Sequence, residues 1–498
     1  MASHNSNLDL IPDAYSSRAR PAVFGQRVAV SAAHPLAAAA ALEVVAQGGG
    51  AADATIAAQA VISVVAPEAG GLGGDAFFLV RKGNGDITAI NAAGRSASAC
   101  CSAVADDGTS VTVPGVVAGW GELSARFGNV PLGTALAPAI RIAQAGFMVR
   151  PETLRALAAQ KPRLVRGGAQ QWPFFDARPS ETVHLPLLAK TLAAVGRFGA
   201  DWFYEGSLGN SIVDAVVQHG GVLSQSDMAK HASVVTEPLS LSWRGLRIHV
   251  QPPMSQGVLL LMALAGFDQL ELSSLERDHA AIELAKATFA FRDEVSQGDA
   301  LLAKPLTVNL DRASERTGPR SYLHTAGVAA ADGDGVIVSS LISVFDDFGS
   351  AIYVRDGDFV LNNRAAGFTN APNDYRSGVL PIHTLAPILV DTGSACFALA
   401  TPGADGQVQT LLQILIGLAV EGLDLPSAID RARWRCEDGR LLVEAGYPAA
   451  EQFAARKHQV IHVAAGDTRF GAVVCAGLAE NRPFACSDWR RETWSLAG

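Results

Sequence analysis

Most of the residue spacings that mark common enzyme chemistries are missing from this sequence. It has no Walker A phosphate loop, no G-x-S-x-G nucleophile elbow, no H-E-x-x-H and no Cys/His spacing of a zinc site. The glycine cluster at 70–74 precedes a predicted strand rather than a helix, so it does not predict dinucleotide binding. His458 and His462 are four residues apart in a segment typical of a strand, where this spacing does not make a metal pair. We therefore expect neither a metal nor an organic cofactor.

One hydroxyl residue begins an unusual strand. Thr325 follows His324 and opens a predicted strand at 325–331, whose alternate residues after Thr325 are Gly or Ala. Small side chains on one face predict open space above that face of a sheet. A turn with two Asp-Gly steps at 332–335 predicts a hairpin with a second strand at 336–345. By strand propensity alone Thr325 is an ordinary strand residue.

Helical patterns dominate before this strand, and short strands dominate after it. Gly48–Gly50 predict the end of one helix, and Asp53 can serve the start of the next. Residues 240–251 form a strand-rich insert within the helical part. The predicted helices lie at 36–47, 51–65, 115–127, 136–145, 187–198, 209–219, 278–295 and 407–420.

Composition excludes several classes of protein. The 498 residues include 39 basic and 48 acidic side chains, a formal charge of −9, which argues against nucleic acid as a partner. With 49% apolar and 17% charged residues the chain is not disordered. The longest apolar stretches, 54–66 and 411–420, are shorter than the ~20 residues that cross a bilayer. By length alone, either about three domains or one large architecture would fit.

Cysteine usage and the N-terminal sequence favour the cytoplasm. The first 21 residues lack the apolar centre of a signal peptide. Six cysteines without a C-x-x-C pair predict reduced, buried thiols in a cytoplasmic protein. They are Cys100, Cys101, Cys396, Cys436, Cys475 and Cys486.

From about residue 20 to its end the sequence resembles the γ-glutamyltranspeptidase family, which belongs to the N-terminal nucleophile hydrolases. Each matching segment is weak by itself, but their collinear order along the chain is very specific. The segments are SAAHPLAAAAALEVVAQGGGAADATIAA, GGLGGDAFF, VTVPGVVAGW, LAPAIRIAQAGF, ADWFYEGSLG, RGLRIHVQPPMSQG, ELAKATFAFRDE, VFDDFGS, VLNNRAAGF, LPIHTLAPILV, TPGADGQVQ and ACSDWRRE.

The resemblance implies that the chain is an inactive precursor that cuts itself between His324 and Thr325. When the family is aligned through the Asp-Gly-Asp-Gly turn, its nucleophilic threonine falls on Thr325. The products would be a large subunit, 21–324 after a polar tail at 1–20, and a small subunit, 325–498. We expect them to remain one intertwined unit, and a dimer of such units is left open. The cut coincides with the change from helical to strand-rich character.

The implied mechanism uses the new N-terminus. Thr325 Oγ attacks the His324 carbonyl, and water hydrolyses the resulting ester. The freed α-amino group, with an unperturbed pKa of about 7.7–8.0, is a suitable general base for the adjacent hydroxyl. The resemblance places the two backbone N–H groups of the oxyanion hole on Gly403 and Ala404, although the family has Gly where this chain has Ala404.

The positions that hold a glutamate head group in true γ-glutamyl enzymes are altered. Arg95 is the counterpart of the arginine that binds the α-carboxylate, although a surface or structural arginine would fit equally. The acidic residue that binds the α-amino group is replaced by Gly367. Ser343 is the counterpart of the second small-subunit hydroxyl, and the family's Asn two residues later becomes Phe345.

The altered pattern resembles the branch that contains oxamate amidohydrolase and acylases. The family's paired serines become His383 and Thr384. Arg364, with Arg95 and His383, could face a small carboxylate-bearing acyl group, because arginine binds carboxylates in a bidentate fork. A buried ion pair for Arg364 and a purely structural role for His383 remain alternatives.

Taken together, the resemblance predicts an α+β, four-layer αββα sandwich and a threonine amidohydrolase that acts on a small or carboxylated acyl amide. One alternative is a γ-glutamyl hydrolase or transpeptidase that acts on glutathione-like compounds. An alternative of another class is an unprocessed, catalytically silent homologue that acts as a binding protein. The expected partners are a small-molecule amide and the two subunits, with no nucleic acid and no membrane.

Overall fold

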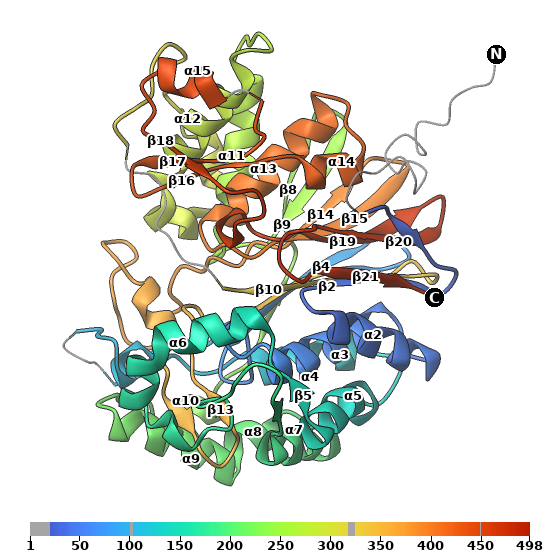
Figure 1. Ribbon diagram of the computed structural model, residues 1–498, viewed down its shortest axis with the longest axis vertical. Helices are drawn as coiled ribbons and strands as arrows, with labels where there is room; N and C mark the ends of the chain where they lie inside the picture. Colours follow the sequence, from blue (N-terminus) through green and yellow to red (C-terminus); the bar gives the residue numbers. More distant parts are fainter. Residues whose placement is uncertain (1–19, 100–102, 317–323, 449) are drawn as a thin grey trace.

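Two β-sheets packed face to face form the centre of the protein. The computed structural model describes residues 20–99, 103–316, 324–448 and 450–498. Each sheet has seven strands, and helices cover both outer faces, so the layers run helix, sheet, sheet, helix (Figure 1). The predicted αββα sandwich is the observed architecture. The predicted tail at 1–20 lies outside the described residues except for Arg20.

The first sheet contains the strand that follows Thr325. Its order is β21-β2-β10-β11-β3-β4-β7, with every neighbouring pair antiparallel. Its strands are β2 (Val28–Ala32), β3 (Asp75–Arg81), β4 (Ile87–Ala92), β7 (Val234–Thr236), β10 (Ala326–Asp332), β11 (Ile337–Ser343) and β21 (Trp494–Ala497).

The second sheet has the order β1-β20-β19-β15-β14-β9-β8 and is also antiparallel. Its strands are β1 (Val23–Phe24), β8 (Leu239–Trp243), β9 (Leu246–Val250), β14 (Ile388–Asp391), β15 (Ala395–Ala400), β19 (Val474–Ala479) and β20 (Arg482–Ser487). Both sheets therefore combine strands from before and after residue 324, which replaces the three-domain estimate with one architecture.

The helices fall into two groups, seen below and above the sheets in Figure 1. The first group is α2 (Pro35–Ala46), α3 (Ala51–Val65), α4 (Val116–Phe127), α5 (Leu132–Ala145), α6 (Pro151–Arg166), α7 (Pro186–Phe198), α8 (Asp201–Glu205), α9 (Ser207–Gln218) and α10 (Gln225–Ala229). The second is α11 (Gly257–Asp268), α12 (Arg277–Phe289), α13 (Gly406–Ala419), α14 (Leu425–Asp430) and α15 (Ala450–Ala455).

Short elements complete the fold. The small strands are β5 (Phe147–Met148), β6 (Thr182–Val183), β12 (Tyr353–Val354), β13 (Phe359–Val360), β16 (Trp434–Glu437), β17 (Arg440–Glu444) and β18 (Val460–Val463). The 3₁₀ segments are η2 (Gly108–Ser110), η3 (Ala169–Gln171), η4 (Arg292–Ala303), η5 (Arg364–Gly367) and η6 (Thr468–Phe470). β18 confirms the strand predicted around His462, so His458 and His462 do not share a helix face.

The small side chains of β10 serve close packing of the two sheets. Ala329 and Ala331 belong to the apolar core between the sheets. A Cβ on Gly327 would come within 2.8 Å of Val474 Cγ2 in the opposite sheet. The prediction of open space above this face is therefore wrong, because β19 fills it.

The N-terminus of α3 confirms the role predicted for Asp53. The carboxylate of this fully buried residue accepts hydrogen bonds from Gly50 N (2.9 Å) and Asn129 N (2.8 Å). Asp332, at the end of β10, accepts another from Ala51 N (2.7 Å). The hairpin that follows Thr325 is thereby attached to the helix layer.

Six helices were missed and one was predicted too long. Two of the missed helices are long: α6, which begins with Pro151 and Glu152, and α11, which is buried almost throughout. The other four, α8, α10, α14 and α15, have five or six residues each. The helix predicted at 278–295 ends at Phe289, where η4 follows after a short turn.

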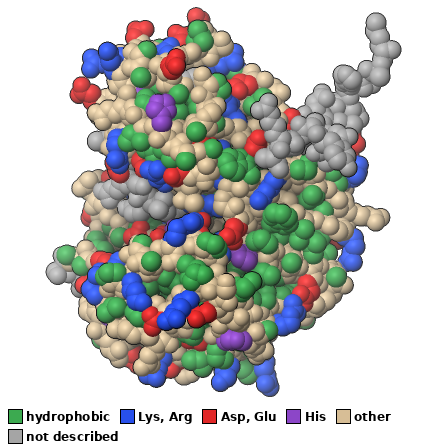
Figure 2. Space-filling model, in the orientation of Figure 1, with side chains coloured by type: hydrophobic (Ala, Val, Ile, Leu, Met, Phe, Trp, Pro, Cys, Tyr) green, Lys and Arg blue, Asp and Glu red, His purple; other side chains and the backbone are tan. Residues whose placement is uncertain are grey.

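The described cysteines are buried, and charged side chains lie on the surface. Four cysteines, Cys396, Cys436, Cys475 and Cys486, are free and buried as expected, whereas Cys100 and Cys101 lie outside the described residues. Within the described ranges, every helix is too short or too polar to span a bilayer. Charged side chains of both signs are interspersed over the face in Figure 2.

Replacing Asp53 tests the attachment of α3. Asp53→Ala leaves two backbone N–H groups without their acceptor, so we expect the free energy of unfolding to fall by about 2–4 kcal/mol. Urea denaturation followed by circular dichroism measures this change. Asp214→Ala, on the exposed face of α9, is the control and should change the value by less than about 0.5 kcal/mol. Equal effects of the two variants would contradict this role of Asp53.

Candidate active site

The hydroxyl of Thr325 lies against the peptide bond that precedes it. Thr325 Oγ donates a hydrogen bond to the carbonyl oxygen of His324 (2.7 Å) and lies 3.2 Å from Ser343 Oγ. Both Thr325 and Ser343 are buried. Phe345, at φ +83°, donates its N–H to Ser343 Oγ (3.0 Å). The Thr325 hydroxyl and its nearest backbone carbonyl thus meet in an environment largely closed to water.

Strand register explains this meeting. β10 and β11 pair so that Ala326 faces Ile342, and β11 and β3 pair so that Ser343 faces Asp75. Thr325, which directly precedes β10, is therefore next to Ser343, and Asp75 follows on the adjacent strand. A shift of one residue would turn these side chains to the other face of the sheet.

Asp75 is a fully buried carboxylate with three donors. Arg364 Nε donates to Asp75 Oδ2 (2.9 Å), His383 Nε2 lies 3.2 Å from the same oxygen, and Gly94 N donates to Oδ1 (3.2 Å). Burial alone would raise the pKa of Asp75, but the hydrogen bond from His383 and the charge of Arg364 lower it below its usual value. Asp75 is therefore ionised.

His383 is neutral and fully bonded. Leu385 N donates to His383 Nδ1 (3.2 Å), so the proton is on Nε2, which faces Asp75. Burial, with the nearby charge of Arg364, lowers the pKa of His383 to about 4. These contacts fit the structural alternative for His383, in which the side chain orients Asp75.

Arg364, in contrast, uses only part of its guanidinium. It is fully buried, and its Nη1 and Nη2 have no hydrogen-bond partner among the described residues. Its Cζ lies 4.5 Å from the centre of the Phe345 ring, beside the Ser343 loop. Burial lowers the pKa of Arg364, although the charge of Asp75 opposes this. Two buried N–H₂ groups without a partner among the described residues, beside the Ser343 loop, are suited to an anionic ligand.

The predicted oxyanion loop joins β15 to α13. Gly403 (φ +120°) and Ala404 (φ +48°) both adopt positive φ. In the described part of the chain, the N–H groups of these two residues donate no hydrogen bond. Gly327 packs on Ala400, which brings the loop to the end of the sheet where Thr325 lies.

Gln256 ties this loop to the segment that holds His383 and Thr384. Its Nε2 donates to Thr384 O (2.7 Å) and to Ala404 O (2.9 Å). Gln256 is fully buried at the start of α11, one of the helices missed from the sequence. Thr384 is buried, and its backbone carbonyl oxygen is linked to the loop through Gln256.

His324 is held by residues to which the sequence analysis gave no role. Its Nε2 lies 2.9 Å from Glu152 Oε1, and its Nδ1 bonds Asp347 Oδ1. Arg491 Nη1 lies 4.0 Å from the same Glu152 oxygen. Pro151 followed by an acidic residue is a helix-start signal that could have indicated α6 and Glu152.

A cavity of about 630 Å³ adjoins these residues. Asp347, Asp346, Asn363 and Phe368 lie on its wall. Asp347 therefore contacts both His324 and the cavity.

Arg95 is located elsewhere. It is exposed, donates to Gly378 O (3.2 Å) and lines a second cavity of about 450 Å³ with Asp227 and His231. No hydrogen bond between Arg95 and Thr325, Ser343 or Arg364 is present in the described ranges. The surface alternative for Arg95 fits these contacts.

One group of side chains has metal-ligand types. His279, Glu283 and His458 bring potential ligand atoms within 4.8 Å of one another. However, His279 Nδ1 lies 2.8 Å from His458 Nε2, and Glu283 pairs with Lys286 (3.1 Å). Because the protein's own contacts use these atoms, we assign no metal to them.

The positive φ of Ala404 gives a testable prediction. Ala404→Gly relieves about 1–2 kcal/mol of backbone strain but increases the entropy of the unfolded chain, so the free energy of unfolding should change by about 1 kcal/mol or less. Ala404→Val adds a β-branched side chain at the same φ and should lower it by about 2 kcal/mol. Urea denaturation distinguishes the two variants, and equal losses would contradict this explanation.

Comparisons with known proteins identify the family of the chain. The family model described as gamma-glutamyltranspeptidase matches residues 37–497. A glutathione hydrolase-like YwrD proenzyme of Bacillus subtilis is 31% identical over 449 residues, covering 83% of this chain and 85% of that protein. An oxamate amidohydrolase proenzyme of Klebsiella pneumoniae is 30% identical over 446 residues, covering 81% and 84%.

A solved structure extends the likeness to the fold. The crystal structure of cephalosporin acylase from Bacillus halodurans aligns with 98% of both chains, at a TM-score of 0.84 and 26% sequence identity. The predicted family and the N-terminal nucleophile hydrolase fold are therefore confirmed. The chain belongs to the gamma-glutamyltranspeptidase family of hydrolases.

Proposed function

We propose that the protein is an N-terminal threonine amidohydrolase that matures by cutting its own His324–Thr325 bond. The observation that carries the proposal is the 2.7 Å contact between Thr325 Oγ and the carbonyl oxygen of His324. The attacking hydroxyl needs no large movement to reach the neighbouring carbonyl carbon. The proenzyme names of the relatives point the same way.

In the maturation step, Thr325 Oγ adds to the His324 carbonyl carbon and the C–N bond breaks. The hydroxyl proton ends on the departing nitrogen, which becomes the α-amino group of Thr325. The product is an ester between the His324 acyl group and Thr325 Oγ. Water then hydrolyses this ester to a His324 carboxylate and a free Thr325 hydroxyl.

The mature reaction repeats the same chemistry on an external amide. The α-amino group of Thr325 takes the hydroxyl proton and later delivers it to the amine that leaves. The unbonded N–H groups of Gly403 and Ala404 are suited to the oxyanion of the tetrahedral intermediate. Water releases the acyl group from Thr325 Oγ.

We assign the acyl group to the carboxylated class because of Arg364. Its two unused terminal nitrogens can donate a fork of hydrogen bonds to a planar carboxylate, and its burial strengthens them. Gly367, whose carbonyl accepts from Asn373 Nδ2 (2.9 Å), has no acidic group for an α-amino group. The names oxamate amidohydrolase and cephalosporin acylase agree with this assignment, whereas the name of the glutathione hydrolase-like YwrD proenzyme agrees with the γ-glutamyl alternative.

The two products, 21–324 and 325–498, are proposed to stay associated. Each sheet contains strands from both segments, so separating them would break hydrogen-bonded pairs such as β2–β10 and β11–β3.

Self-cleavage can be tested on a denaturing gel. The wild-type chain should give two bands, and N-terminal sequencing of the smaller one should begin at Thr325. Thr325→Ala removes the nucleophile and should leave one full-length band, whereas Thr325→Ser should still be cut. A single full-length band for both the wild type and Thr325→Ala would instead favour the silent binding protein.

The acyl group can be tested with p-nitroanilides that share one leaving group. We expect kcat/KM for the glutaryl compound to exceed that for the uncharged pentanoyl compound by about 10–100-fold, the value of one or two charge-assisted hydrogen bonds. Arg364→Lys keeps the charge but loses the fork, and should remove most of this preference. Oxamate and oxamide give the same contrast for a two-carbon acyl group.

The exposed Arg355→Lys is the matched control and should leave the preference unchanged. A γ-glutamyl compound that is hydrolysed faster than the glutaryl compound would overturn the substrate assignment. It would leave the threonine mechanism intact.

A further inference from the structure

The side chain of His324 lies between two carboxylates from opposite sides of the predicted cut. Glu152 is in the first turn of α6, before the cut, and Asp347 follows β11, after it. Glu152 Oε1 is 2.9 Å from His324 Nε2, and Asp347 Oδ1 bonds Nδ1. His324 itself is 93% buried, with 7% of its surface exposed. The residue that must present its carbonyl to Thr325 is thus fixed at both ring nitrogens.

This arrangement determines the protonation of the ring. An ionised carboxylate only accepts hydrogen bonds, so both ring nitrogens must donate, and the ring is an imidazolium. Burial alone would lower the pKa of His324, but the bonds to Asp347 and Glu152 outweigh it and raise the pKa above its usual value. Burial would likewise raise the pKa of Glu152, but the bond from His324 and the charge of Arg491 lower it to about 2.

Other charges surround this group of three. Arg491 lies 4.0 Å from Glu152 Oε1, and Arg155 lies 3.8 Å from Oε2. Arg150, at the start of α6, acts on Glu152 from a greater distance. Asp346 neighbours Asp347, and burial raises the pKa of Asp346. Glu152 and Asp347 are thus balanced by His324 and Arg491, so removing the imidazolium charge leaves two carboxylates without full compensation.

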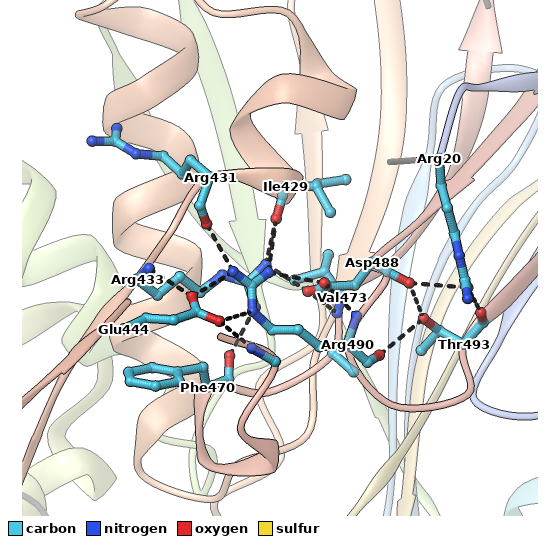
Figure 3. A network of polar contacts seen from close by, with 12 residues as sticks. Arg20, Ile429, Arg431, Arg433, Glu444, Phe470, Val473, Asp488, Arg490 and Thr493 are labelled. Atoms are coloured by element: carbon cyan, nitrogen blue, oxygen red, sulfur yellow. Dashed lines mark hydrogen bonds and ion pairs between the residues drawn. The ribbon is translucent and has the colours of Figure 1, made fainter. Parts of the chain in front are cut away.

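A buried network determines the position of Arg491. The preceding residue, Arg490, binds Glu444 (2.5 Å) and Asp488 (2.9 Å), and Arg433 binds the same aspartate (2.6 Å) (Figure 3). Arg490 is fully buried, so it fixes the chain on the side of the second sheet. Arg491 then reaches Glu152 of the first helix layer.

We propose that the His324 imidazolium, bound between Glu152 and Asp347, positions the His324 carbonyl against Thr325 Oγ, so that these two carboxylates are positioning residues for self-cleavage. The inference rests on the proposed function, because it concerns the maturation step of that mechanism. Orienting a reacting carbonyl accounts for large rate factors, and a misplacement of 1 Å can cost about 100-fold.

The pH dependence has a definite sign. The pKa of His324 is raised in the folded precursor, so the contact with the two carboxylates is complete below its ordinary pKa of about 6.5 and is lost as pH rises through the raised value. The rate of self-cleavage in the wild type, divided by that of the neutral variant His324→Gln, should therefore fall towards one at high pH. At pH 6 we expect this ratio to be about 10–100.

Variants of the carboxylates test the assignment. Glu152→Gln and Asp347→Asn should each slow self-cleavage at pH 6 by about tenfold or more and shift the high-pH decline to lower pH, because one partner of the imidazolium is lost. The matched control is Asp176→Asn, which changes an exposed carboxylate paired with Lys161. It should change neither the rate of self-cleavage nor its pH profile. A structural defect alone would slow self-cleavage without shifting the pH at which its rate declines. Unchanged rate and pH profile in both variants would overturn the inference.

A measurement without cleavage separates this inference from the proposed function. The uncut Thr325→Ala precursor can be labelled with ¹⁵N-histidine and titrated by NMR. The His324 signal is the one that disappears when His324→Gln is added to this precursor. Its pKa should lie above 6.5 and fall in Glu152→Gln. A normal pKa overturns the inference even if the wild type cuts itself. If the pKa of His324 is raised but the wild type never cuts itself, the proposed function and the positioning role are both refuted. The ion pairs of His324 with Glu152 and Asp347 would still be supported.

Discussion

A single buried carboxylate organises the candidate site. Asp75 lies opposite Ser343 in the β3–β11 register, and its burial is tolerated because Arg364, His383 and a backbone N–H all donate to it. The same contacts hold Arg364 by Nε alone and leave its two terminal nitrogens unused. The position of the Arg364 guanidinium beside Phe345 is therefore a consequence of how the protein compensates one charge.

Local patterns were sufficient to predict the elements around Thr325. The Asp-Gly turn predicted the β10–β11 hairpin, and the glycines before Asp53 predicted the break between α2 and α3. In both places the local turn or cap chemistry agrees with the tertiary structure. The family resemblance then supplied the layers and the position of Thr325, which strand propensity could not distinguish from any other strand threonine.

What the sequence could not supply depends on contacts between distant segments. Glu152 reaches His324 across 172 positions, and nothing near either residue signals that contact. From sequence alone, the small residues of β10 predict open space above the sheet. Only the packing of the two sheets shows that Val474 occupies this space. Arg95 aligned with a substrate-binding arginine, yet its loop points it at Gly378 O. α11 was missed because a helix that is apolar on all sides has no periodicity to detect.

The fold is compatible with a stable product of the cut that we propose between His324 and Thr325. Thr325 directly precedes strand β10, which pairs with β11 from Ala326 and with β2 from Val328, so strand pairing would hold the proposed new N-terminus. Among the described residues, the side chain of His324 is held by Glu152 and Asp347, and its carbonyl oxygen accepts a hydrogen bond from Thr325 Oγ. In the proposed maturation step, the cut would add a third carboxylate beside those two, which would weaken the hold on His324 while leaving Thr325 in place. The difference between strand pairing and the ion group would thus favour release of His324 and retention of Thr325.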